Sequence, residues 1–258
     1  MPECFIPNWY KGGLSQPAAF VGFRIRRGET PRPTAECPMG GLLMKPLRYL
    51  ITAGPTREFF DPIRYISNRS SGKMGYAIAK AAAKTGMVTL ISGPTALPQP
   101  TGLQFVSVTT AAEMAAAVFR AFTKADVVIM AAAVCDYRPR QISPRKLKKT
   151  ARQSGLELVP TPDILLELGK RKRRQVLVGF AAETNDVERH ALDKLRRKNL
   201  DLIVANDTRA FEGDTNIVTL IHRDGRIERL PELTKAKVAR AILKRIRALT
   251  AGLSVAGP

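Results

Sequence analysis

The segment from Asp61 to Gly75, DPIRYISNRSSGKMG, carries the side chains best suited to chemistry on an anionic substrate. It follows an apolar strand-like run, LRYLITAG, and leads into a helix-like run that starts near Ser70, Ser71 and Gly72. The first turn of a helix exposes unpaired backbone N–H groups and the positive end of the helix dipole, so a phosphate fits there. An ordinary turn, in which Ser70 or Ser71 caps the helix and the glycines only allow packing, explains the loop equally well.

Three familiar nucleotide motifs do not match this region. Gly72-Lys73-Met74 lacks the upstream glycine and the Ser or Thr of a P-loop, and no GxGxxG follows the first strand. Tyr76 and Lys80 have the YxxxK spacing of short-chain dehydrogenases, but they fall on the first expected helix, where nicotinamide chemistry does not occur. If the loop binds a phosphate, it does so without any of these motifs.

Polar or aromatic groups also accompany three later strand-like runs. Asp136 follows DVVIMAAAV, where its carboxylate can accept hydrogen bonds from a ribose or a base. Phe180 lies in GFAAET at a strand end, and its ring can stack on a base. The helix-like run before DLIVAND carries Lys194 and Lys198, and Asn206 stands near the end of that strand. Simpler interpretations are a turn aspartate, a core phenylalanine and a solvated basic helix face.

A basic stretch without acidic residues runs from Arg138 to Arg152, RPRQISPRKLKKTAR, with Lys146 opening its KLKK core. We expect a mobile basic flap over residues 138–156 that closes over a triphosphate and neutralises charge as pyrophosphate leaves. Composition alone fits a solvated loop or a nucleic-acid patch as well, and the basic run at 170–174 is equally ambiguous.

Length, charge and composition narrow the class of protein. The chain has 258 residues, 45% of them hydrophobic, which is enough for a full globular core. Its formal charge of +20 favours polyanionic partners: nucleic acid, an anionic membrane surface or phosphorylated small molecules. Three scattered cysteines and two histidines suit neither a disulfide framework nor a usual zinc site, and we assign no metal ligand. Because no run is long and apolar enough to cross a bilayer, and no signal peptide is recognisable, we predict a cytoplasmic protein without a membrane partner.

Strand-like and helix-like runs alternate from Leu47 onward and indicate an α/β protein. The pattern predicts a Rossmann-like, mostly parallel sheet with helices on both faces. A later run, NIVTLIHRDGRIERL, predicts a C-terminal β-hairpin through Asp224-Gly225. Residues 1–43 are rich in Pro and Gly, so we expect a flexible extension, or a wrongly assigned start, ahead of a domain over 44–258. An intact mass that includes Met1 would exclude the wrong start.

Taken together and in order, a series of motifs resembles the phosphopantothenate–cysteine ligase family, also called phosphopantothenoylcysteine synthetase, of coenzyme A biosynthesis. The motifs span roughly residues 47–246 and read ITAGPTRE, DPIRYISNRSSGKMG, AAAVCDYR, KLKK, GFAAET, KNLD and IVAND. The resemblance implies a Rossmann-like homodimer that uses CTP and Mg²⁺ to join 4′-phosphopantothenate to L-cysteine. The phosphopantothenate carboxylate first attacks the α-phosphate of CTP, which gives an acyl-cytidylate and pyrophosphate. The cysteine amine then attacks the acyl carbon and releases CMP.

The resemblance also implies roles for individual residues. Asn68 matches the asparagine that handles the acyl-cytidylate, and Lys146 matches the lysine required in the first step. Arg64 matches a residue that binds the phosphopantothenoyl group. We assign the remaining candidates by ligand: Ser70, Ser71 and Gly72 to the substrate, and Asp136, Phe180, Lys194 and Lys198, together with Lys146, to the nucleotide.

Other implications concern partners and alternatives. A flavin-dependent decarboxylase often precedes this module in bacteria, and nothing before Leu47 matches one, so we expect a separate decarboxylase as the pathway neighbour. The GFAAET and KLKK motifs favour CTP over the ATP of eukaryotic relatives. Cys135, where many members have alanine, and the Phe59-Phe60 pair are apolar departures that we expect to leave the chemistry unchanged. A nucleic-acid-binding protein and a Rossmann oxidoreductase are the rival hypotheses, and the missing glycine fingerprint argues against the second.

Overall fold

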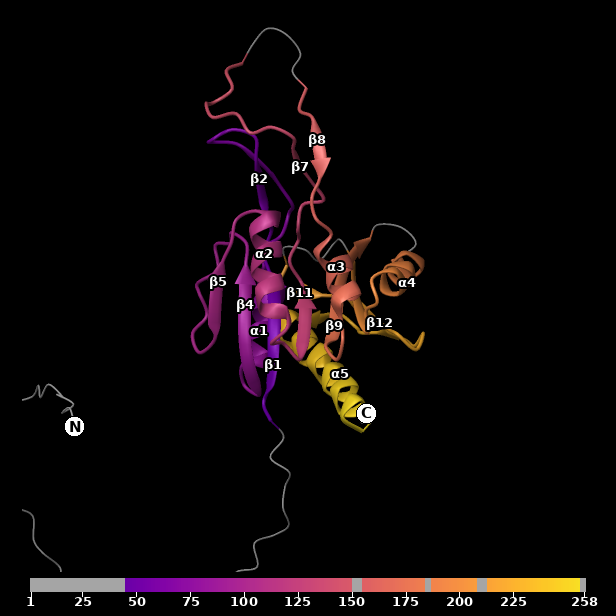
Figure 1. Ribbon diagram of the computed structural model, residues 1–258. Helices are drawn as coiled ribbons and strands as arrows, with labels where there is room; N and C mark the ends of the chain where they lie inside the picture. Colours follow the sequence, from indigo (N-terminus) through magenta and orange to yellow (C-terminus); the bar gives the residue numbers. More distant parts are fainter. Residues whose placement is uncertain (1–44, 150–154, 184–186, 208–212, 256–258) are drawn as a thin grey trace, which may run out of the picture. The chain divides into compact units, whose positions relative to one another are not determined.

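The computed structural model describes residues 45–149, 155–183, 187–207 and 213–255. These residues belong to one unit, Met44–Pro258, and the extension expected over residues 1–43 lies outside them. Strands and helices alternate along this unit, as Figure 1 shows. In the described part of the chain, every helix is too short or too polar to cross a membrane.

An eight-stranded sheet forms the centre of the unit, in the order β13-β12-β10-β9-β6-β1-β4-β5. The six neighbouring strands β10, β9, β6, β1, β4 and β5 pair in parallel. β12 pairs antiparallel with both β10 and β13. The strand order reverses between β1 and β6, and this is the point at which doubly wound sheets bind ligands. The strands are β1 (Leu47–Ala53), β4 (Gly86–Ser92), β5 (Gln104–Ser107), β6 (Val127–Met130), β9 (Val176–Glu183), β10 (Leu202–Asp207), β12 (Val218–His222) and β13 (Ile227–Arg229).

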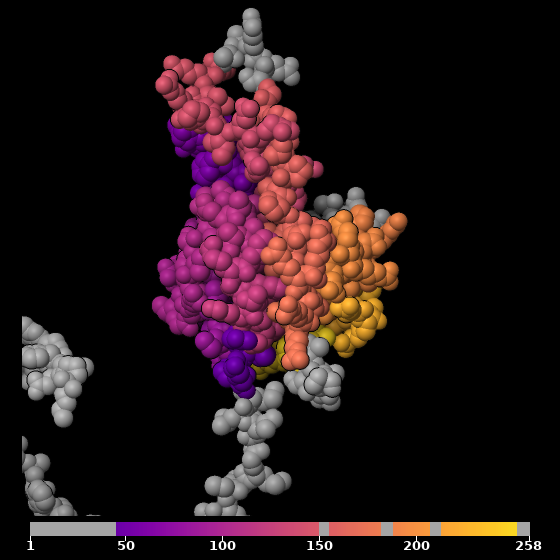
Figure 2. Space-filling view, in the orientation of Figure 1, coloured from indigo at the N-terminus to yellow at the C-terminus, as the bar shows by residue number. Residues whose placement is uncertain are grey.

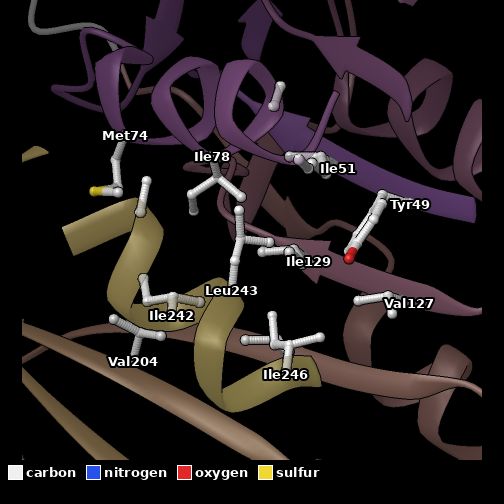
Figure 3. Packing of buried hydrophobic residues seen from close by; sticks show 14 of the residues in the cluster. Tyr49, Ile51, Met74, Ile78, Val127, Ile129, Val204, Ile242, Leu243 and Ile246 are labelled. Carbon is white, nitrogen blue, oxygen red and sulfur yellow. The ribbon is translucent and has the colours of Figure 1, made fainter. Parts of the chain in front are cut away.

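Helices cover both faces of the sheet. On one face, α1 (Lys73–Ala82) and α5 (Lys235–Val255) pack their apolar side chains against β1, β6 and β10 (Figure 3). On the other face, a second apolar cluster joins the sheet to α2 (Ala111–Phe122), α3 (Ile164–Arg171) and α4 (Val187–Arg197). Successive residues of β1 contribute to opposite clusters, so both of its faces are buried. The expected α/β, mostly parallel fold is therefore confirmed.

The expected C-terminal hairpin is also confirmed. β12 and β13 pair antiparallel, and Gly225 turns the chain with φ 88° while its N–H donates to the carbonyl of His222 at 3.0 Å. A glycine suits this position because side chains disfavour a positive φ. By contrast, the apolar run DVVIMAAAV is longer than its strand: β6 ends at Met130, and the residues after it form a loop.

Two antiparallel hairpins that sequence patterns did not reveal extend beyond the carboxyl edge of the sheet (Figure 1). The first pairs β2 (Arg57–Phe59) with β3 (Tyr65–Ser67), and the second pairs β7 (Tyr137–Pro139) with β8 (Leu158–Pro160). Figure 2 shows their surfaces in contact above the sheet. The second hairpin carries residues 138–149 and 155–156 of the expected flap, and we call these residues with β7 and β8 the basic arm. The movement expected of this flap stays a prediction.

Candidate functional site

The loops that follow β1 and β6 are joined at the point where the strand order reverses. The N–H of Ala133 donates to the carbonyl of Gly54 at 2.9 Å, and the N–H of Thr56 donates to the carbonyl of Ala133 at 3.2 Å. The buried hydroxyl of Thr56 also accepts the N–H of Cys135 at 2.9 Å. These bonds hold residues 54–56 against residues 133–135, so side chains from both loops share one edge of the sheet.

Asn68 lies where these two loops meet. Its Nδ2 donates to the carbonyl of Val134 at 3.0 Å and to that of Ala133 at 3.3 Å. Asn68 itself is exposed, so its amide is reachable from solvent while it is oriented by the loop after β6. The structure thereby brings Asn68 next to the loop that carries Asp136. This position is expected, because the loops that follow parallel strands lie together at the carboxyl edge of the sheet.

The start of α1 is not capped by a serine. Gly72 occupies the N-cap position with φ 75°, and no side-chain hydrogen bond caps the helix there. A Cβ on Gly72 would lie 2.7 Å from the methyl group of Thr95 and 3.3 Å from Cα of Gly54. The explanation of Ser70 or Ser71 as an N-cap is therefore wrong. The N–H of Gly72 donates to Oγ of Ser70 at 3.4 Å, and the N–H groups of the first turn of α1 have no acceptor within the helix, as at any helix start.

A pocket of about 180 Å³ opens between the ends of β6 and β9. Its wall contains Asp136, which is exposed, and Phe180, which is half-buried. Lys194 of α4 and Lys198, which directly follows this helix, complete the set, so the structure brings together the four nucleotide candidates that lie outside the basic arm. A larger pocket of about 630 Å³, near the amino ends of β1, β4 and β5, contains none of the predicted site residues.

Both lysines of this pocket have partners within the protein. Nζ of Lys194 donates to the carbonyl of Phe180 at 3.0 Å. Nζ of the buried Lys198 lies 2.7 Å from a carboxylate oxygen of Asp163, which also caps α3 by accepting the N–H of Leu166 at 3.0 Å. Burial raises the pKa of Asp163, but the bond from Lys198 and the bond from Leu166 outweigh it and hold that pKa below its ordinary value. The two lysines therefore shape the pocket wall rather than extending into it as free cations.

Arg64 and Lys146 lie apart from this pocket, where the first loop contacts the basic arm. Arg64 pairs with Asp61, and its Nη2 also donates to the carbonyl of Leu147 at 2.8 Å. Lys146 is exposed on the arm next to this contact. The predicted residues thus fall into three groups: the pocket with Asn68, the entrance of α1, and the contact between loop and arm.

Sequence reasoning missed two carboxylates of the site, Asp61 and Asp163. Both carried a usable signal, because aspartate favours turns and helix starts. Asp163 stands directly before the helix-like run ILLELGKR, and Asp61 accepts the N–H of Ile63 two residues later at 2.9 Å, as a turn aspartate does. What the sequence could not indicate is their long-range contact with Lys198 and with the basic arm.

Comparisons with known proteins agree with the motifs. The family model described as the DNA/pantothenate metabolism flavoprotein C-terminal domain matches residues 44–249. The "Coenzyme A biosynthesis bifunctional protein CoaBC" of Bacillus subtilis (strain 168) is 51% identical over 207 residues, which cover 78% of this chain and 51% of that protein. The chain therefore spans about half the length of the curated relatives it matches.

Solved structures show the same likeness. The crystal structure of the C-terminal domain of CoaBC is 48% identical with a TM-score of 0.71, and the match covers 81% of this chain and 97% of that one. A Cab2 mutant in complex with phosphopantothenate-cysteine matches with a TM-score of 0.68 over 81% of this chain and 88% of that one, and its 16% identity shows a shared fold alone. These findings confirm the family resemblance seen in the motifs. The chain belongs to the family of the DNA/pantothenate metabolism flavoprotein C-terminal domain.

Proposed function

We propose that this protein is a phosphopantothenate–cysteine ligase that joins 4′-phosphopantothenate to L-cysteine at the expense of CTP. The observation that carries the proposal is the position of Asn68, whose amide is bonded to the loop after β6 beside the pocket of Asp136 and Phe180. An amide beside a pocket that could accept a base supports a reaction through an acyl nucleotide. The relatedness to bifunctional CoaBC proteins of coenzyme A biosynthesis supports the same conclusion.

In the first step, the phosphopantothenate carboxylate attacks the α-phosphate, the new acyl–phosphate bond forms, and pyrophosphate leaves with the bonding electron pair. The protein contributes positioning and positive charge to such a displacement. Arg64 holds the phosphopantothenoyl part, and among the described residues its Nη1 is in no hydrogen bond and can face a substrate oxygen. Lys146 neutralises charge that develops on the phosphates.

In the second step, the cysteine amine attacks the acyl carbon, a proton leaves the nitrogen, and CMP departs. Negative charge develops on the acyl oxygen before CMP leaves, and hydrogen-bond donors stabilise such an oxyanion. One N–H of Asn68 can turn to this oxygen while the other keeps its bond to Val134. The entrance of α1, with Ser70, Ser71 and Gly72, receives a phosphate of the substrate.

The pocket beside β9 is the proposed site of the cytosine. The half-buried ring of Phe180 offers a face on which a base can stack, and Asp136 can accept a hydrogen bond from the ribose or the base. The GFAAET and KLKK motifs favour CTP over ATP.

Magnesium is the proposed cofactor of the nucleotide. Among the described residues, no group of three or more His, Cys, Asp or Glu could hold a metal ion. Within the pocket, Asp136 is exposed, whereas Asp163 is engaged by Lys198. This donor set fits an ion that is bound mainly by phosphates with one carboxylate nearby, which is usual for Mg²⁺. When bound, the ion supplies positive charge at the phosphates.

A homodimer is the proposed assembly. Most of the exposed large apolar side chains among the described residues gather on the two hairpins and the basic arm. They are Ile63, Tyr65, Tyr137, Ile142, Leu147, Leu156 and Leu158. Such a concentration of exposed apolar area is typical of a protein interface. Light scattering is expected to give about twice the chain mass of 28.3 kDa, and a monomer at micromolar concentration would contradict the assembly.

One reaction tests the proposed function. The purified protein is incubated with 4′-phosphopantothenate, L-cysteine, Mg²⁺ and either CTP or ATP, and pyrophosphate and 4′-phosphopantothenoylcysteine are measured. We expect both products with CTP, much less of each with ATP, and no pyrophosphate without phosphopantothenate. Without cysteine, pyrophosphate release should stop after about one turnover, because the acyl-cytidylate then remains on the protein.

The rival hypotheses give different outcomes in the same assay. No turnover with either nucleotide would refute the ligase. Salt-sensitive binding of DNA or RNA without pyrophosphate release would favour a nucleic-acid-binding protein. Binding of NAD(P)H with hydride transfer would favour an oxidoreductase.

A further inference from the structure

A buried carboxylate, Asp61, connects the first loop to the basic arm. The exposed fraction of its side chain is 0%, although it lies in a loop. Its Oδ1 accepts the N–H of Ile63 at 2.9 Å and the N–H of Arg64 at 2.8 Å. Its Oδ2 accepts Nε and Nη2 of Arg64 at 2.9 and 2.6 Å, and the N–H of Leu147 at 3.2 Å. These bonds occupy the accepting positions that a carboxylate offers.

The ion pair holds both backbone polar groups of Leu147. Asp61 accepts the N–H of Leu147, and Nη2 of Arg64 donates to the carbonyl of the same residue. The peptide bond between Lys146 and Leu147 is therefore fixed directly by Asp61. A second bond between the first loop and the arm lies close by, from the N–H of Ser143 to the carbonyl of Phe60 at 3.0 Å.

Hydrogen bonds rather than apolar packing fix this part of the arm. Leu147 is 47% exposed, and the residues around it are exposed as well, so burial contributes little. The bonds from Arg64 hold the pKa of Asp61 far below its ordinary range despite burial. Asp61 is thus ionised at working pH, and its contribution to stability is present above about pH 4 and is lost only as the pH falls through the lowered value.

We propose that Asp61 is a positioning residue for the first chemical step: by accepting the N–H of the Lys146–Leu147 peptide bond while it pairs with Arg64, it fixes the position of Lys146 relative to Arg64. The inference rests on the proposed ligase function. Through Asp61, the residue assigned to the phosphopantothenoyl group and the lysine assigned to the phosphates form one unit. A displacement of about 1 Å can cost up to about 100-fold in rate, so the loss of this connection should reduce turnover while leaving Lys146 itself intact.

The test replaces Asp61 with asparagine and compares it with a matched substitution elsewhere. Asp126→Asn is the control, because Asp126 also accepts Nε and Nη2 of one arginine, Arg48, at 3.1 and 2.8 Å, together with the backbone N–H of that arginine. This pair lies at the amino ends of β1 and β6, away from the site. In both variants an amide NH₂ replaces an accepting oxygen and meets guanidinium donors.

We expect Asp61→Asn to lower kcat for pyrophosphate release about 10- to 100-fold, with the KM for CTP changed less than about threefold. Asp126→Asn should stay within about twofold of the wild-type kcat. Hydrogen exchange at the Leu147 amide should become about tenfold faster in Asp61→Asn alone. Asp61→Glu keeps the charge and should recover part of kcat, and it serves as the variant of choice if Asp61→Asn does not fold.

Two outcomes would overturn the positioning role. One is a kcat for Asp61→Asn that equals the kcat of the Asp126→Asn control. The other is a lowered kcat without any change in exchange at the Leu147 amide. Absence of turnover in the wild-type protein would instead refute the proposed function. Faster hydrogen exchange at the Leu147 amide in Asp61→Asn would then still show that Asp61 fixes this peptide bond.

Discussion

Replacing Lys146 with alanine is expected to lower pyrophosphate release by about 100- to 1,000-fold, the usual effect of removing one charged donor from a site where charge develops. Lys146 is exposed on the basic arm, beside the contact that Asp61 and Arg64 make with Leu147. The backbone of Lys146 is therefore fixed on one side, while the residue itself is exposed to solvent. Because alanine removes only the charge and the stem, the fold of the arm should persist.

The measurement is a coupled assay for pyrophosphate under saturating CTP, phosphopantothenate and Mg²⁺. Lys148→Ala is the matched control, since Lys148 is an exposed lysine two residues further along the same arm. This control should keep kcat within about threefold, because Lys148 lies on the other side of Leu147, where the backbone carbonyl bonds to Arg64 and not to Asp61. Retention of more than about a tenth of the wild-type rate by Lys146→Ala would remove Lys146 from the first step.

Replacing Asn68 with aspartate is expected to separate the two steps of the reaction. The amide of Asn68 donates to two carbonyl oxygens, and a carboxylate at this place cannot donate and faces both oxygens with like charge. The acyl-cytidylate should still form, since the phosphate charge in the first step is met by Lys146. Its conversion should fall by about 100- to 1,000-fold, because the oxyanion of the second step loses its donor.

Rapid quenching distinguishes this outcome from a general loss of activity. We expect a burst of about one pyrophosphate per site, an acyl-cytidylate that accumulates, and little phosphopantothenoylcysteine. The control is Asn199→Asp, because Nδ2 of Asn199 likewise donates to a backbone carbonyl, that of Gly169 at 3.1 Å, outside the pocket. Product formation by Asn68→Asp at the wild-type rate would show that the amide has no role in the second step.

The sequence predicted the elements whose signals are local. The start of α2 at Ala111 is an example, because the hydroxyl of Thr110 accepts the N–H of Glu113 and a carboxylate oxygen of Glu113 accepts the N–H of Thr109. This reciprocal cap can be recognised in the sequence, because the residues that form it are only three and four positions apart. The expected strand DVVIMAAAV was too long, because its pairing with β9 ends at Met130 opposite Gly179. An apolar run shows where a strand can form and not where its partner stops.

The short hairpins illustrate what a single sequence cannot show. β2, β3, β7 and β8 have three residues each, and β3 and β8 bury little, so no period can be recognised. They are held by each other and by contacts between residues far apart in sequence, such as Asp61 with Leu147. The grouping of Asn68 with Asp136 was predictable from the geometry of a parallel sheet, whereas the pairing of Lys198 with Asp163 depends on how α3 and α4 pack.

The first loop leaves and re-enters the fold at almost the same point. A Cβ added to Gly72 would lie 3.3 Å from Cα of Gly54, and the methyl group of Thr95 packs against both glycines. The segment between them, which contains Arg64 and Asn68, is therefore a loop whose two ends are packed together by Gly54, Gly72 and Thr95. Because the entropy cost of closing a loop grows only slowly with its length, a loop whose ends are already packed together tolerates changes in length between them. A change within this loop must nevertheless preserve the bonds of Asp61 and Arg64 to Leu147, because they connect the loop to the basic arm.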